Sequence, residues 1–166
     1  MHSSQTIEGV SELAPPPGRL IAIDLGAKRV GVAVSDELQM TVTALERIER
    51  RSWKDLLRRI AALIDDYDAR ALVIGLPLSL DGAESDAAQE AKRLAENFRR
   101  SSVVPIYLQD ERLTTFAAES ELKSRGLKAG EVETQIDSES AAMILRDFIA
   151  EHVPAEGRQQ PGHEGD

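Results

Sequence analysis

Hydrophobic residues in this chain occur as short runs separated by turn residues. Leu20–Ile23 and Val30–Val34 flank a turn built from Gly26 to Arg29, a pattern typical of a β-hairpin. Met40–Ile48 alternates apolar and polar residues and predicts a third extended segment. Because Leu20–Ile23 has no polar alternation, we expect the first strand to be buried on both faces.

Helical periodicity begins after this third segment. Ser52 is typical of an N-cap, and the apolar residues of Trp53–Tyr67 follow at i, i+3, i+4 spacing, which indicates a helix packed on a sheet. Ala71–Leu76 is wholly apolar and predicts a fourth strand, and Val103–Gln109 predicts a fifth. The pattern therefore changes from a meander to alternating strands and helices.

Three more helices are predicted. The second helix of the chain is expected from about Asp81 to Phe98, with Asp81 and Glu84 at capping-box spacing. The remaining two are expected over about 114–123, capped by a threonine, and over Asp137–Glu151, with a glycine-containing break between them.

This order of elements predicts an α/β fold. An antiparallel β-meander followed by β-α-β units gives a five-stranded mixed sheet with helices on both faces. We expect one domain over residues 19–152. Residues 1–18, with three consecutive prolines, and residues 153–166 are expected to be a disordered leader and a disordered tail.

Charge and composition restrict the function classes. The net charge of −9, from 20 basic and 29 acidic residues, argues against a general electrostatic nucleic-acid binder, although an acidic site neutralised by metal ions stays compatible with a nucleic-acid enzyme. Aromatic residues make up 4% of the chain, too few for a base-stacking platform. The chain lacks cysteine, a long apolar segment and a signal-peptide pattern, so we expect a cytoplasmic protein that does not enter a membrane.

Acidic residues stand at positions where solvated surface residues are not expected. Asp24 ends the first strand, Asp110 and Glu111 end the fifth, and Asp137 opens the last helix on its apolar face. Asp24 could instead hydrogen-bond its turn, and Asp137 could cap its helix or interact with the helix dipole. Since neighbouring strand residues point to opposite faces, alternation leaves open which of Asp110 and Glu111 faces a site.

Together these carboxylates predict a metal site. In an open α/β sheet the ends of central strands converge on one crevice, where the carboxylates would repel one another. Mg²⁺ or Mn²⁺ relieves that repulsion, and two such ions can activate water and stabilise the leaving oxygen of a phosphodiester. The core has no histidine except His152 at its edge, which argues against zinc hydrolysis.

Four motifs resemble those of the YqgF/RuvX family of bacterial RNase H-like nucleases. In chain order they are Ile23-Asp24-Leu25-Gly26 with 29–36, Val73–Leu78 with Asp81-Gly82, Gln109–Thr115, and Ile136-Asp137-Ser138 with 141–145. Each motif alone is weak, but four in the right order cover nearly the whole core.

The resemblance implies an RNase H-like fold and an acidic triad of Asp24, Glu111 and Asp137 that binds Mg²⁺ or Mn²⁺. The choice of Glu111 over Asp110 as the site residue rests only on this analogy. The family is assigned to nucleases that mature the 5′ end of pre-16S rRNA, with ribosomal precursor particles as partners. It was also proposed to resolve Holliday junctions, which would require a homodimer, whereas RNA processing is compatible with a monomer.

Basic residues beside these motifs suit a phosphate-handling role. Lys28 and Arg29 lie in the turn after Asp24, and Arg112 follows Glu111. The cations of the second helix are more simply interpreted as a solvated helix face.

Two other functions compete with a nuclease. The Asp-Leu-Gly opening resembles the first phosphate loop of actin-like ATPases and sugar kinases, but those proteins need two such domains, and this chain has room for one. A non-catalytic RNA-binding module of the same fold ranks second, since it would not need to keep all three carboxylates.

Overall fold

A mixed sheet of five strands forms the centre of the protein. The computed structural model describes residues 14–77, 84–101, 104–111 and 129–154, and in the last of these segments it describes side chains from Ser138 onward. The strand order is β3-β2-β1-β4-β5. Their bounds are β1 Leu20–Leu25, β2 Arg29–Ser35, β3 Val42–Glu49, β4 Ala71–Leu76 and β5 Ile106–Asp110.

The topology confirms the predicted RNase H-like mixed sheet. β1, β2 and β3 form an antiparallel meander, and β4 and β5 add in parallel beside β1. Since β1, β3, β4 and β5 all run in one direction, their last residues meet at one end of the sheet, where β2 begins. We call this the carboxyl end of the sheet.

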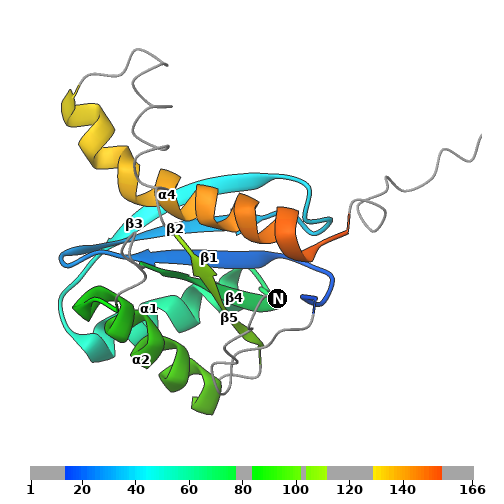
Figure 1. Cartoon of the computed structure of the whole chain (residues 1–166), viewed down its shortest axis with the longest axis horizontal. Coiled ribbons are helices and arrows are strands. Elements are labelled where there is room, and N and C mark those ends of the chain that lie inside the picture. The colour runs from blue at the N-terminus through cyan, green and yellow to red at the C-terminus, as the bar shows by residue number, and fades with distance from the viewer. Residues whose placement is uncertain (1–13, 78–83, 102–103, 112–128, 155–166) are drawn as a thin grey trace, which may run out of the picture.

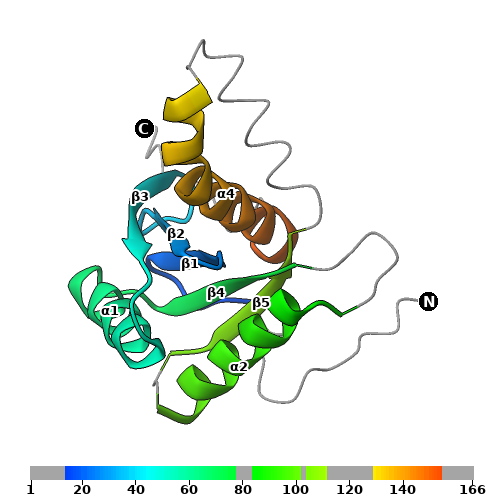
Figure 2. The same cartoon turned by 90° about the vertical axis from the view of Figure 1, so that its left-hand side faces the viewer.

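Helices cover both faces of the sheet, as predicted. α1 (Trp53–Asp66) and α2 (Asp86–Ser101) lie on one face, and α4 (Ala129–His152) crosses the other (Figures 1 and 2). Ser52 caps α1 as expected, because its hydroxyl accepts a hydrogen bond from the Asp55 amide at 3.0 Å. The predicted stripe of α1 is buried through Leu56, Ile60 and Ile64.

Large aliphatic side chains fill the core between the sheet and α1 and α2. The sheet contributes Ile21, Ile23, Val32 and Ile74, and Phe98 closes the layer from α2. These branched residues suit buried strands, and removing each from water contributes about 1.5–3 kcal/mol. This face is a packed hydrophobic layer.

The face under α4 is built differently. Alanines stand on both sides of the interface, with Ala22, Ala33 and Ala71 on the sheet and Ala141 and Ala142 on the helix. Small side chains let a helix backbone come close to a sheet. Farther along α4 the larger Ile144, Leu145 and Phe148 complete the layer, and the Phe148 ring meets Tyr107 of β5 edge-on, with centroids 4.9 Å apart.

Two predicted helix starts are wrong. α2 begins at Asp86, because the Ser85 hydroxyl caps it by accepting from the Ala88 amide at 3.2 Å, and Glu84 pairs with Lys92 at 3.0 Å. Asp81, the other member of the predicted capping box, lies outside the described residues. The last helix begins at Ala129, so Asp137 lies inside it and does not open it. A glycine costs a helix only about 1 kcal/mol, too little for Gly130 to end it.

Other predicted segments lie partly or wholly beyond the described residues. These are the helix over about 114–123, residues 1–13 of the leader and residues 155–166 of the tail. Within the described ranges, no helix is long and apolar enough to cross a membrane.

Arg50 joins three separate segments near the carboxyl end of the sheet. Its amide donates to the Lys28 carbonyl at 2.9 Å, and its Nη1 donates to the Gly26 carbonyl at 2.8 Å. The same guanidinium meets both carboxylate oxygens of Glu90 on α2, at 2.5 and 3.2 Å. Arg50 therefore ties the turn between β1 and β2 to the helical layer.

We predict that Arg50→Met lowers the free energy of unfolding by about 2 kcal/mol, because the Glu90 carboxylate and the Gly26 carbonyl lose a charged donor. The exposed pair of Arg58 with Asp55 supplies the control, and Arg58→Met is expected to cost about 0.5 kcal/mol or less. Urea unfolding of the two variants measures the difference. Equal stabilities would contradict a structural role for Arg50.

Candidate active site

Asp24 lies on the face of the sheet that α4 covers. Along β1, Ile21 and Ile23 pack toward α1 and α2, whereas Leu20 and Ala22 pack toward α4. Asp24 continues the second set because successive strand residues alternate between faces. Its backbone is enclosed by strands on both sides, since it pairs with Gly31 of β2 and follows Ile23, which pairs with Ile74 of β4. Asp24 is thus a partly buried carboxylate in the central strand.

Glu111, rather than Asp110, shares this face. Tyr107 of β5 packs under α4, and the Gln109 amide donates to the Glu151 carboxylate of that helix at 3.1 Å. By the same alternation Glu111 faces α4 and Asp110 points to the other face. The Glu111 amide donates to the Leu76 carbonyl at 3.2 Å, which extends the strand pairing by one residue. The geometry therefore separates two residues that alternation along the sequence left equivalent.

Gly75 makes room for the Glu111 carboxylate. A Cβ on this glycine would lie 2.5 Å from Oε2 of Glu111 and 2.7 Å from Cδ1 of Ile144 on α4. Both distances are well inside van der Waals contact. Gly75 thus leaves a gap in β4 between Asp24 on β1 and Glu111 beyond β5, and the Glu111 carboxylate occupies it.

The two carboxyl groups interact directly. Burial, the charge of Asp24 together with a hydrogen bond to it, and the charge of Asp110 raise the pKa of Glu111 to about 9. At neutral pH the Glu111 carboxyl therefore keeps a proton, because two adjacent carboxylates cannot both ionise at low cost. At neutral pH Asp24 and Glu111 together therefore carry one negative charge instead of two.

This donor set fits a hard divalent cation. Carboxylate oxygens are the ligands that Mg²⁺ and Mn²⁺ prefer, and a cation would remove the repulsion that now holds the proton on Glu111. Among the residues whose side chains are described, no three metal-ligating groups gather in one place. The described part of the site is therefore a pair, Asp24 and Glu111.

Asp137 is carried by α4 toward the same region. The next residue, Ser138, accepts a hydrogen bond from the Val32 amide at 3.5 Å, and Val32 pairs with Ile23 beside Asp24. A β-bulge between Val30 and Val32 interrupts the pairing of β2 with β3 at this point. The Asp137 side chain lies outside the described part of the chain.

The predicted cationic residues fall into two groups. Lys28 is exposed in the turn after β1, and Arg29 is half-buried at the start of β2. Both lie at the carboxyl end of the sheet. Arg112 lies outside the described residues.

Sequence reasoning missed the roles of Gly75 and Arg50. The signal for Gly75 was present, because a glycine inside a wholly apolar strand often marks a close approach by another group. The signal for Arg50 was not, since nothing in the sequence pairs it with Glu90, 40 residues away.

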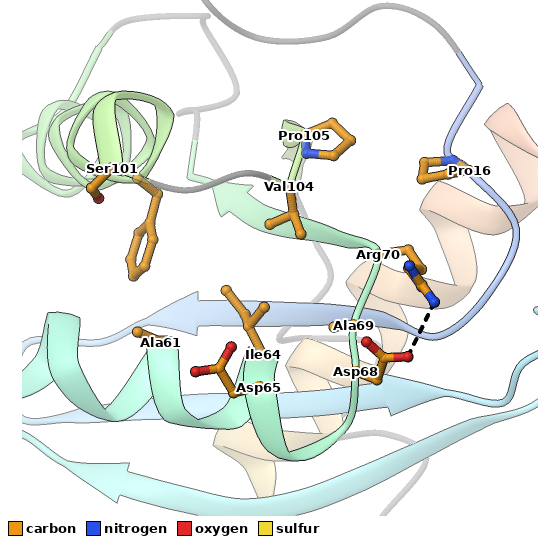
Figure 3. Close-up of a pocket in the computed structure, with 11 residues that line it drawn as sticks. Pro16, Ala61, Ile64, Asp65, Asp68, Ala69, Arg70, Ser101, Val104 and Pro105 are labelled. Carbon is orange, nitrogen blue, oxygen red and sulfur yellow. Dashed lines mark hydrogen bonds and ion pairs between the residues drawn. The ribbon is translucent and has the colours of Figure 1, made fainter.

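A cavity of about 600 Å³ opens at the other end of the sheet (Figure 3). It lies between the last turns of α1 and α2, and Ile64, Phe98, Val104 and the ion pair of Arg70 with Asp68 help to line it. Asp24 and Glu111 do not contribute to its lining. The carboxylate pair and this cavity are therefore separate features.

Comparisons with known proteins agree on one family. Residues 18–151 match RuvX, described as a Holliday junction resolvase. A protein of Anaeromyxobacter sp. (strain K) named "Putative pre-16S rRNA nuclease" is 40% identical over 136 residues, which cover 82% of this chain and 99% of the relative. A protein of the same name from Mycobacterium tuberculosis (strain ATCC 25177 / H37Ra) is 39% identical over 149 residues, 89% of this chain and 88% of the relative.

Similarity of structure extends to more distant proteins. The Fowlpox virus resolvase, solved with substrate Holliday junction DNA, aligns with a TM-score of 0.50 over 82% of this chain and 99% of its own, at 11% sequence identity. This likeness concerns the fold alone. The match over residues 18–151 and the two relatives near 40% identity show that the chain belongs to the RuvX family.

Proposed function

We propose that this protein is a metal-dependent endonuclease that hydrolyses phosphodiester bonds of structured RNA and processes the 5′ end of pre-16S rRNA. The observation that carries the proposal is the hydrogen bond between the carboxyl groups of Asp24 and Glu111, for which Gly75 leaves space because it has no side chain. A protein gains nothing in stability from two adjacent, partly buried carboxyl groups. Such a pair is explained by a function that needs a cation.

Asp24, Glu111 and Asp137 would hold Mg²⁺ or Mn²⁺. When bound, a pair of such ions supplies an activated water and stabilises the leaving oxygen of a phosphodiester. The chain itself positions these groups, because Asp24 is held in the central strand and the Glu111 backbone amide donates a hydrogen bond to the Leu76 carbonyl. Asp137 is included because the next residue on α4, Ser138, accepts a hydrogen bond from Val32 of β2, which places the Asp137 backbone near the β1–β2 pair.

RNA is preferred as the substrate because the relatives near 40% identity carry the name pre-16S rRNA nuclease. The second candidate function is resolution of four-way DNA junctions, which the description of the RuvX family favours. Cutting a junction symmetrically requires two active sites, so a homodimer in solution would favour the second candidate. Cleavage of an RNA stem with a 5′ extension, compared with cleavage of a four-way DNA junction in Mn²⁺, distinguishes them.

Asp24→Asn is expected to reduce cleavage by about 1,000-fold or more, because it removes a charge from the proposed metal site. The melting temperature should stay the same or rise, since repulsion with Glu111 is relieved. Asp110→Asn is the matched control, with the same change on the other face of β5, and should cost less than about tenfold. Full activity of Asp24→Asn, or of the wild type in excess chelator, would reject a metal-carboxylate mechanism.

The pKa of Glu111 predicts an unusual pH dependence of stability. Without metal, the folded state keeps this proton up to about pH 9, whereas the unfolded state loses it near 4.5. The contribution of Glu111 to the stability of the folded state is therefore fully present below pH 4.5 and is lost progressively as the pH rises to about 9. Glu111→Gln should remove this decline and melt above the wild type at pH 8.

Metal affinity should also depend on the protonation of Glu111. Mg²⁺ affinity is expected to rise by up to about tenfold per pH unit below the pKa of Glu111, because binding displaces the proton. Calorimetric titrations at pH 6, 7 and 8 measure the trend. A pH-independent affinity in the wild type would contradict a role for Glu111 as a ligand.

Gly75→Ala should separate geometry from stability. The added methyl group displaces the Glu111 carboxylate and Ile144, and such overpacking costs about 1–3 kcal/mol. Val73→Ala, buried two residues earlier on the same face, is the control, because it should lose a similar amount of stability without adding an atom beside the Glu111 carboxylate. We expect Gly75→Ala to lose at least about 100-fold in cleavage and Val73→Ala to lose little. Equal activity of the two variants would show that the gap at Gly75 has no catalytic role.

A further inference from the structure

Basic residues are concentrated in the chain that leads from β3 into α1. Six of the fourteen residues from Glu46 to Arg59 are basic and three are acidic, in a protein whose net charge is −9. This segment lies at the carboxyl end of the sheet, because β3 ends there and α1 begins there. The hydrogen bond from the Arg50 backbone amide to the Lys28 carbonyl joins this segment to the turn that follows Asp24. Opposite charges thus meet at one end of the molecule.

Several of these cations already have partners. Arg50 binds Glu90, and Arg58 binds Asp55 at 2.7 Å. Arg47 pairs with Glu49 at 3.1 Å, and Arg59 donates to the backbone carbonyl of that glutamate at 3.2 Å. Each of these side chains thus has a partner within the protein.

Four cations at this end of the sheet have no such partner among the described residues. They are Lys28, Arg29, Arg51 and Lys54, which we call the basic rim. Arg51 follows Arg50 and so lies close to Lys28, and Lys54 is in the first turn of α1. Lys28, Arg51 and Lys54 are exposed. In the described part of the chain only Arg19, just before β1, is similarly unpartnered.

Most other cations in the described part have a partner, except Arg19, and the Arg93 guanidinium lies over the Trp53 ring. Arg99 and Arg100 share Glu96, Arg70 pairs with Asp68, and Lys92 pairs with Glu84. In a protein with more acidic than basic residues, neutralising every surface cation would be easy. The rim is therefore a local departure from the pairing found on most of the described surface, and it lies at the same end of the sheet as the carboxylate pair.

We propose that the basic rim binds the sugar-phosphate backbone of the substrate and guides it to the carboxylate pair, with Arg51 and Lys54 extending the contact made by Lys28 and Arg29. This inference rests on the proposed function, because it takes the substrate to be a nucleic acid. Phosphate contacts offset the repulsion between an acidic protein and a polyanion and carry no sequence preference. RNA and DNA share this chemistry.

Salt-dependent binding tests the rim directly. All proteins carry Asp24→Asn, so that substrate is not cut, and the probes are a fluorescent RNA stem with a 5′ extension and a four-way DNA junction. The test variant is Lys28→Gln with Arg51→Gln and Lys54→Gln. The control is Arg70→Gln with Arg99→Gln and Arg100→Gln, which makes the same change in net charge at the opposite end of the sheet.

The expected result is a smaller salt dependence in the test variant alone. Three lost phosphate contacts reduce the slope of log K against log[KCl] by about 2–3, at 0.7–0.9 per contact. The arm with the larger loss identifies whether RNA or DNA is the polymer that the rim holds. Equal slopes in the test and control variants on both probes would overturn the inference.

The outcome is independent of catalysis. If the wild type cuts RNA in Mg²⁺ and the slopes are equal, the nuclease proposal stands and the rim is rejected. If the wild type cuts neither probe and only the rim variant loses salt dependence, the rim stands as a binding surface, and the nuclease proposal fails.

Discussion

The contact between the carboxyl groups of Asp24 and Glu111 is the constraint on which the site depends. It is unfavourable by itself, because burial and neighbouring negative charge keep a proton on Glu111 up to about pH 9. The fold nevertheless provides for it. β4 presents a glycine between the two side chains, and β5 is extended by one hydrogen bond so that Glu111 reaches the face under α4.

The remainder of the fold holds that contact in place from two sides. On one face, bulky aliphatic residues fill the space under α1 and α2 and make the central strands rigid. On the other face, alanines let α4 approach the sheet closely, which brings the Asp137 backbone toward β1 and β2. Arg50 then connects the turn after Asp24 to α2. Packing on both faces thus supports a locally unfavourable pair of carboxyl groups, as is common in catalytic sites.

The distribution of charged residues along the sheet is uneven, which the net charge alone does not reveal. The overall value of −9 suggests a protein that repels nucleic acid. The described surface, however, pairs most of its cations except at the carboxyl end of the sheet, where both the basic rim and the carboxylates lie. This arrangement makes the metal-dependent reading of the carboxylates and the phosphate-binding reading of the rim parts of one functional hypothesis.

The order of the described strands and helices, the mixed topology of the sheet and the family could be predicted from the sequence alone, because hydrophobic periodicity and motifs can be recognised in short stretches of chain. Helix starts were less predictable, since Ser85 and Ala129 replaced the expected boundaries. Only the tertiary structure decided that Glu111 faces Asp24 and that Gly75 leaves the space between them. The reason is physical: these relations depend on strand register and on contacts between residues distant in sequence, which a single strand's alternation cannot specify.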